Sequence, residues 1–351
     1  MPKSNDISVG NIVEYVKSSL KLEVKVEDIF KEYQKKKYNK EPNNEFILEA
    51  SDLVLFISCP RQFLLKMLEE TTGVKSPVRK TQQMLRGEFW HKVFKEAAKD
   101  TQDRFNSRDE NEIAKCLIEK FDEVKKNYHI EEFESYNDDL IKEKILKQFA
   151  KNEAKRREIG YRTIETEIRK TCDVKVDING NIFIYKIIGN IDRIDIINNN
   201  HVIIDYKIKE KIKKLNFLKK DNNDKNNLKL YPDKSSLQLA IYSFIFKNSE
   251  NYQGKIKCGI INIFGEDEID EIRYNRENHQ ERVFELIENS INTFHTQFLS
   301  KQIDIKLDNA FFFNNGVANR DYDELDLQYG GCKCCEYNLL CLGLITQFKD
   351  K

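Results

Sequence analysis

The sequence contains no long apolar run. None of its apolar stretches approaches the ~20 residues that a membrane-spanning helix requires. The first residues, MPKSNDISVGNIVEYV, lack the apolar core of a secretion signal. These two absences argue against a membrane or secreted protein, and we therefore expect a cytoplasmic protein with no membrane partner.

The chain also lacks an excess of charge of either sign. Lysine plus arginine and aspartate plus glutamate each number 59, so the formal net charge is zero. A surface that binds nucleic acid must therefore be a local patch. Apolar residues make up 40% of the 351 residues and charged residues 34%. The chain is long enough for one large domain or two small ones, with a sizeable core under a polar surface.

Apolar periodicity predicts helices in the first half of the chain and near its end. Ser51 is a candidate N-cap for the helix at 51–70, and Ser235 or Ser236 for the helix at 235–249. Pro60 should interrupt the first of these helices, which leaves Cys59 at the kink. Residues 101–160 are predicted to form a charged helical insertion. The expected helices cover residues 7–20, 26–38, 51–70, 78–100, 110–128, 136–158, 235–249 and 277–300.

At about Tyr161 the pattern changes to the alternation of β-strands. Turns at residues 178–181 and 198–200 divide this stretch into the strands of a meander. The apolar run 255–264 predicts a strand buried on both faces, and residues 270–274 could pair with it. An α/β fold with a mixed central sheet is therefore expected.

The domain organisation follows from these segments. We expect an N-terminal helical appendage, residues 1–45, followed by one large domain, residues 46–347. Within that domain, residues 208–236 are rich in lysine and asparagine and show little periodicity. Such a loop either closes over a polyanion or is a disordered insertion.

Two aspartates and a lysine lie where the strands should be apolar. Asp192 is surrounded by isoleucines, and Asp205 and Lys207 share a face of the next strand. Buried carboxylates are costly unless they are paired or bind a metal, and carboxylate oxygens suit hard divalent cations. The set fits metal-assisted phosphodiester hydrolysis. A D-x-K motif by itself, however, is more often a half-buried Asp–Lys pair that only ties two strands together. Glu165 or Glu167 could add a further acid, but exposed strand glutamates are more frequent.

Four of the eight cysteines lie close together near the end of the chain. Cys332 and Cys335 form a C-x2-C pair, and Cys341 follows after five residues. Thiolates at this spacing bind a soft metal or an iron–sulfur cluster. A cluster needs a fourth ligand, for which the upstream Cys59 and the local Cys334 compete. A four-cysteine zinc site is the alternative.

Six motifs follow one another in a defined order. They are Cys59-Pro60, Gly87-x3-His91, Gly189-x2-Asp192, Asp205-x-Lys207, Gln238-x3-Tyr242 and Cys332-x2-Cys335-x5-Cys341. In this order they resemble the RecB-type branch of the PD-(D/E)XK nuclease superfamily. The closer resemblance is to its iron–sulfur subgroup, which includes AddB-like nucleases and CRISPR-associated RecB-like exonucleases. It covers roughly residues 46–345.

The resemblance implies a catalytic metal site. His91, Asp192, Asp205 and the backbone carbonyl of Tyr206 would bind Mg²⁺ or Mn²⁺. Lys207 would be the catalytic lysine, acting with the two aspartates.

The resemblance also implies roles for the remaining motifs. Gln238 and Tyr242 would support the active site and contact DNA. A [4Fe–4S] cluster would join the end of the chain to its beginning. Its ligands would be Cys59, Cys332, Cys335 and Cys341, with Cys334 as an extra thiol inside the motif.

The implied fold is a restriction-endonuclease-like αβββαβ core with a C-terminal iron–sulfur staple. The implied function is metal-dependent DNA cleavage, more as an exonuclease on single strands or DNA ends than as an endonuclease, in CRISPR adaptation or in recombination and repair. No G-x4-G-K-[ST] helicase motif is present, so a helicase or an integrase-type protein is a candidate partner. The alternative is a non-catalytic DNA-binding or assembly subunit, against which the intact Asp192, Asp205 and Lys207 argue.

Overall fold

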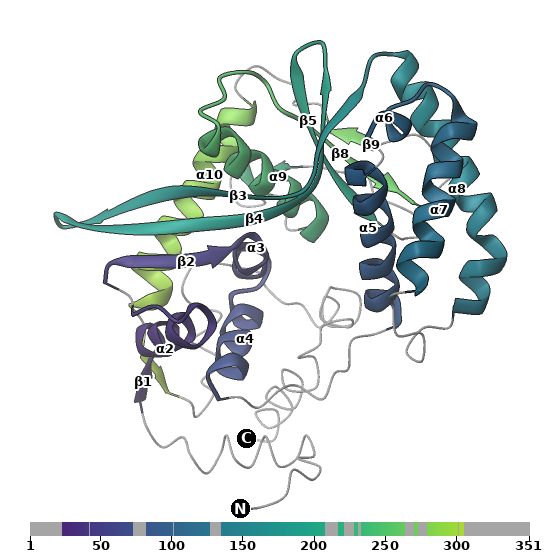
Figure 1. Cartoon of the computed structure of the whole chain (residues 1–351). Coiled ribbons are helices and arrows are strands. Elements are labelled where there is room, and N and C mark those ends of the chain that lie inside the picture. The colour runs from purple at the N-terminus through teal and green to yellow at the C-terminus, as the bar shows by residue number, and fades with distance from the viewer. Residues whose placement is uncertain are drawn as a thin grey trace, which may run out of the picture.

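A six-stranded mixed sheet lies at the centre of the molecule (Figure 1). Its strands are β2 (Glu45–Glu49), β3 (Arg162–Ile178), β4 (Asn181–Ile197), β5 (Asn200–Lys207), β8 (Lys257–Asn262) and β9 (Asp270–Ile272). Strands β3 and β4 form a long antiparallel hairpin. On its other side β4 pairs parallel with β2 and then antiparallel with β5. Strand β8 is parallel to β5 and antiparallel to β9.

The computed structural model describes most of the expected domain. The described residues are 23–41, 43–72, 82–100, 102–126, 135–207, 217–220, 228–230, 233–263, 270–272, 279–300 and 302–304. Two small antiparallel sheets accompany the central one: β1 (Glu23–Lys25) with β10 (Gln302–Asp304), and β6 (Leu218–Lys220) with β7 (Leu228–Leu230).

Two groups of helices lie on opposite sides of the twisted sheet (Figure 1). The first group is α2 (Val26–Tyr38), α3 (Ala50–Ser58), α4 (Pro60–Thr72), α9 (Lys234–Ser249), α10 (His279–Thr293) and the π-helical turn η2 (Phe294–Leu299). The second group is α5 (Gln82–Asp100), α6 (Gln102–Phe105), α7 (Glu110–Lys126) and α8 (Ser135–Glu158). Across the described ranges, no helix combines the length and the low polarity needed to cross a membrane.

Each group of helices builds its own hydrophobic core against the sheet. In β5, Ile203 packs in the first core, whereas Val202 and Ile204 pack in the second. This alternation explains why β5 reads as an apolar run, since both of its faces are covered. Helix α2 lies in the segment expected to be an appendage, yet Phe30 and Tyr33 are fully buried in the first core.

A buried ion network joins helix α8 to strand β4. Arg193 is fully buried and donates to Glu153 at 2.7 Å and to both carboxylate oxygens of Asp195 at 2.7 Å. Arg157 donates to Glu153 at 2.8 Å, and Arg156 donates to Asp195 at 2.9 Å. Bidentate charged hydrogen bonds of this kind impose a defined geometry. They fix the helical insertion against the strand.

Most sequence expectations for the elements are confirmed. The α/β class and the mixed sheet are observed, and the order β3, β4, β5, α9, β8 behind a helix agrees with an αβββαβ core. The helix break at Cys59 separates α3 from α4. The expected helix 7–20 and the loop residues 208–216 and 221–227 lie outside the described residues.

Both predicted helix caps were wrong. Helix α3 begins after Glu49, whose side chain forms a reciprocal capping box with Asp52, so Ser51 is not the N-cap. Helix α9 begins after Asp233, which accepts from the backbone N–H of Ser236. In both cases an acidic residue before the expected serine satisfies the free N–H groups of the first turn.

Candidate metal centre

The predicted site residues meet where strands β4 and β5 part. The ladder between the two strands ends at the pair Arg193–Ile204. Beyond it, the backbone N–H of Tyr206 donates to Asp192 Oδ2 at 2.9 Å. A buried backbone donor needs an acceptor, and here the carboxylate supplies it in place of a strand carbonyl. Asp192, only 8% exposed, is thereby held at the fork.

Helix α5 brings His91 to the same fork. Phe94 of this helix stacks on the ring of Tyr206, with ring centroids 5.0 Å apart. The half-buried His91 stands edge-on to Tyr206, and its Nδ1 lies 3.4 Å from Asp192 Oδ2. The side chain of Tyr206 therefore positions the helix that carries His91. The backbone carbonyl of Tyr206 as a metal ligand stays a prediction.

Glu167 of strand β3 joins this group, although the strand pattern favoured an exposed glutamate. Its Oε1 lies 3.7 Å from His91 Nδ1. The candidate ligand atoms of His91, Glu167 and Asp192 all lie within 4.8 Å of one another. The backbone of Glu167 has φ of 49°, a left-handed conformation that is uncommon for residues other than glycine. Such strain persists where the surroundings hold it, often at functional sites.

The sequence did hold a signal for Glu167. The hairpin turn sets Ile178 opposite Asn181, and the same register gives the pairs Thr166–Arg193 and Ile168–Ile191. Counting back from the turn therefore places Glu167 opposite Asp192. The choice between Glu165 and Glu167 could have been made from that count.

Asp205 and Lys207 face helix α9 from strand β5. Asp205 is 1% exposed, and Lys207 Nζ lies 2.7 Å from its Oδ2. This contact is an ion pair without the direction of a hydrogen bond, so within the described structure Asp205 Oδ2 is a buried acceptor with no hydrogen bond. Lys207 Nζ instead donates to Gln238 Oε1 at 3.1 Å.

Gln238 and Tyr242, one helical turn apart on α9, support the lysine. Gln238 Nε2 donates to the hydroxyl oxygen of Tyr242 at 2.9 Å. Tyr242 in turn packs on Gly189, where an added Cβ would lie 3.1 Å from Tyr242 Cδ1 and 2.8 Å from Ile245 Cδ1. Gly189 is thus required for the close approach of α9 to β4. At Gly87, by contrast, an added Cβ would meet no atom within 4 Å.

Burial and neighbouring charges shift the pKa values in the site. Burial raises the pKa of Asp205 to about 6, with Lys207 opposing and Asp192 adding to the shift. Burial lowers the pKa of His91, but the hydrogen-bonding carboxylates Asp192 and Glu167 outweigh it and raise the pKa to about 10. Burial likewise lowers the pKa of Lys207, and Asp205 reverses that shift. The site therefore gathers negative charge that attracts a cation.

The donor set fits a hard divalent metal ion. Carboxylate oxygens, the ligands that Mg²⁺ and Mn²⁺ prefer, come from two strands to one point. His91 adds one imidazole nitrogen, which would bind a metal only after losing its proton. Asp205 is a further carboxylate of the site, because its charge interacts with those of Asp192 and His91, and its Oδ2 accepts no hydrogen bond within the described residues.

The iron–sulfur prediction falls mostly outside the described residues, because Cys332, Cys335 and Cys341 lie there. Cys59 is described: it is a half-buried free thiol at the break between α3 and α4. The other described cysteines, Cys116, Cys172 and Cys258, are buried and form no disulfide within the described residues. Their burial is typical of cysteines that pack as small apolar residues.

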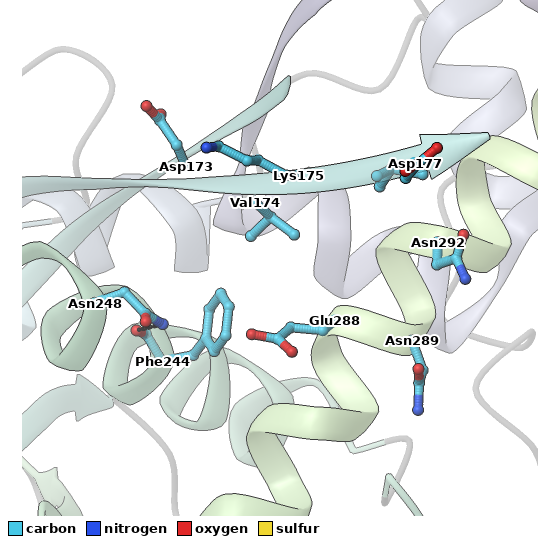
Figure 2. Close-up of a pocket in the computed structure, with 10 residues that line it drawn as sticks. Asp173, Val174, Lys175, Asp177, Phe244, Asn248, Glu288, Asn289 and Asn292 are labelled. Carbon is cyan, nitrogen blue, oxygen red and sulfur yellow. Dashed lines mark hydrogen bonds between the residues drawn. The ribbon is translucent and has the colours of Figure 1, made fainter. Parts of the chain in front are cut away.

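A polar groove of about 340 Å³ lies elsewhere, between strand β3 and helices α9 and α10 (Figure 2). Asp173 and Lys175 lie on its strand side, and Phe244 and Glu288 on its helix side. Asp173 is six residues along β3 from Glu167, which corresponds to ~20 Å of strand. The groove is therefore separate from the metal centre.

Comparisons with known proteins identify the family of the chain. No curated protein matches the chain. The solved crystal structure of SSO0001 is similar over 94% of this chain and 95% of its own, at 16% sequence identity and a TM-score of 0.31, which is too low to bear on fold or activity. The family model described as the PD-(D/E)XK nuclease superfamily matches residues 48–342. This range includes every residue of the metal centre, and the chain therefore belongs to the PD-(D/E)XK superfamily of divalent-metal nucleases.

Proposed function

We propose that the protein is a divalent-metal-dependent deoxyribonuclease that hydrolyses phosphodiester bonds at the β4–β5 fork. The observation that carries the proposal is the convergence of His91, Glu167 and Asp192 beside the Asp205–Lys207 ion pair. A bound Mg²⁺ or Mn²⁺ supplies positive charge that polarises the phosphate and acidifies a water molecule.

One group of residues would hold the metal ion. His91, Asp192 and Asp205 hold the cation, with Glu167 as a further acid and the Tyr206 carbonyl as a predicted ligand. The N–H of Tyr206 orients Asp192.

On the other side of the site, Lys207 stabilises the negative charge that develops on the phosphate. Gln238 accepts from Lys207 and keeps its ammonium group in place. Tyr242 in turn anchors the Gln238 amide and is predicted to contact DNA.

The finer assignment rests on the order of motifs in the sequence. We propose a RecB-like enzyme, more an exonuclease on single-stranded DNA or DNA ends than an endonuclease. CRISPR adaptation and recombination or repair are the processes that this resemblance suggests, with a helicase or an integrase-type protein as partner.

An iron–sulfur cluster is proposed as a second cofactor, with ligands Cys59, Cys332, Cys335 and Cys341. The spacing of the three C-terminal cysteines supports it, and so does the half-buried free thiol of Cys59. Anaerobically purified protein should be brown and contain iron and sulfide in equal amounts. Cys59→Ser should lose the visible absorbance, whereas Cys172→Ala, which changes a buried thiol, should keep it. If the purified protein is colourless and contains zinc, the cysteines form a zinc site and not an iron–sulfur cluster.

The test of the nuclease proposal is cleavage of end-labelled single- and double-stranded DNA in Mg²⁺ or Mn²⁺. We expect the wild type to cut and Asp205→Asn to bind DNA without cutting. Asp173→Asn, which changes an exposed aspartate of strand β3, is the matched control and should cut normally. If the wild type binds DNA but cuts in neither metal, the non-catalytic assembly subunit becomes the better account. The label pattern separates exonuclease from endonuclease.

A further inference from the structure

Two exposed polar residues follow the metal centre along the β3–β4 hairpin. Arg169 and Asn190 are cross-strand partners, and both are exposed. Their neighbours Ile168 and Ile191 pack against the first core. Since side chains alternate along a strand, Arg169 and Asn190 point away from that core. Asp192, two residues further along β4 than Asn190, contacts His91 of helix α5, which belongs to the second group of helices.

The side chains of Arg169 and Asn190 have no partner among the described residues. Within those ranges, neither side chain makes a hydrogen bond or an ion pair. The adjacent Lys170 is different, because it donates to Glu250 at 2.7 Å and lies 3.4 Å from Glu165. Of these two neighbouring cations, only Arg169 has its charge and its hydrogen-bond donors available to a ligand.

The distance from this pair to the metal centre matches the distance between successive phosphates of a nucleic acid. Asn190 and Asp192 are two residues apart on β4, which corresponds to ~7 Å of strand. That length is comparable to the separation of successive phosphates in an extended nucleic-acid strand. A guanidinium group offers a planar fork of donors to a phosphate, and the asparagine amide adds N–H donors.

We propose that Arg169 and Asn190 bind the phosphate that neighbours the scissile phosphodiester. This inference rests on the proposed nuclease function and names residues that hold its substrate. The contact fixes the register of the strand at the metal centre and carries no base information, since phosphate contacts position without specifying sequence. Arg169 and Asn190 are substrate-binding residues that take no part in the bond cleavage.

The experiment compares Arg169→Gln and Arg169→Lys with the control Arg162→Gln. Arg162 is another exposed arginine of β3, seven residues away, or ~24 Å along the strand. Binding of a labelled single-stranded oligonucleotide is measured against salt concentration in the Asp205→Asn background, which does not cut. Steady-state cleavage and Mn²⁺ affinity are measured without that background mutation.

We expect Arg169→Gln to lose DNA affinity by about tenfold or more, as for a charged hydrogen bond. The slope of log affinity against log salt should fall by about 0.7 for one lost contact to single-stranded DNA. KM should rise with kcat and Mn²⁺ affinity unchanged. Arg169→Lys should keep the slope, because it keeps the charge, and recover part of the affinity.

Two results would overturn the inference. One is an Arg169→Gln protein whose salt slope and KM equal those of the wild type and of Arg162→Gln. The other is a loss of kcat together with Mn²⁺ affinity, which would make Arg169 part of the metal centre. In both cases a wild type that cuts leaves the nuclease proposal standing. If the wild type neither binds nor cuts DNA, the nuclease proposal itself fails, and this inference with it.

Discussion

Gly189→Ala should lower both the stability of the protein and its rate of DNA cleavage. The added methyl group would lie 2.8 Å from Ile245 Cδ1 and 3.1 Å from Tyr242 Cδ1, closer than van der Waals contact allows. Both side chains lie in the first core, and Ile245 is fully buried. Overfilling a packed core costs about 1–3 kcal/mol, and the lower entropy of the unfolded alanine chain offsets about 0.4–1 kcal/mol of this. We expect the free energy of unfolding to fall by about 0.5–2 kcal/mol.

The matched control is Gly87→Ala. A Cβ at Gly87 meets nothing within 4 Å, and the residue lies within helix α5. Alanine should therefore raise the free energy of unfolding by about 0.5–1 kcal/mol. Urea unfolding at equal protein concentration measures both changes. Equal stability of Gly189→Ala and the wild type would show that α9 does not press on β4 as described.

The same Gly189 variant should also lose activity. A displaced Tyr242 moves its hydrogen-bond partner Gln238, which holds Lys207 Nζ. We expect kcat to fall, and DNA affinity measured without cleavage should weaken as well, since Tyr242 is predicted to contact DNA. A variant with normal kcat would separate the Gln238–Tyr242 pair from the chemistry.

Two further predictions concern the strands of the site. Glu167→Gly should weaken Mn²⁺ binding measured by calorimetry. The free energy of unfolding should stay the same or rise, since glycine accepts φ of 49° without the strain that glutamate bears. A clear loss of stability would show that the backbone at Glu167 is not strained. Burial raises the pKa values of Asp195 and Glu153, but Arg193 outweighs it and lowers both. The stability they contribute is therefore present above the ordinary carboxyl pKa of about 4 and is lost as pH falls below it. Urea midpoints between pH 7 and pH 3 should fall more steeply for the wild type than for Asp195→Asn, and parallel curves would refute this.

Local patterns in the sequence were enough for most elements of the fold. The expected helix 26–38 coincides with α2, and the meander, its turns and the buried strand β8 lie where alternation placed them. Strand β2 was missed, because five residues carry little periodicity and its partner β4 is far away in the chain. The caps at Glu49 and Asp233 were missed because a serine, which is a frequent N-cap residue, lies nearby in each case and was predicted to be the cap.

The site was predictable only as far as short motifs reached. The structure places His91 against Asp192 and Lys207 against Asp205, and the catalytic roles that the order of motifs implied for them stay predictions. Glu167 required the register of the hairpin in addition to the pattern of its own strand. The support of Asp192 by the N–H of Tyr206 depends on the point at which two strands separate, and no local pattern marks that point.

Strand β4 is continuous beside the fork, but its side chains depart there from regular alternation. Ile191 and Ile194 both pack in the first core, although same-face residues of a regular strand are two apart. The alternation therefore breaks between them, and Asp192 and Arg193 both turn away from that core.

Asp192 goes to the metal centre, and Arg193 goes to the ion network of helix α8. The left-handed Glu167 lies opposite the same break. The helical insertion and the metal centre thus share one irregularity of the backbone. The ion network of α8 and the metal centre therefore use adjacent residues of β4, Arg193 and Asp192.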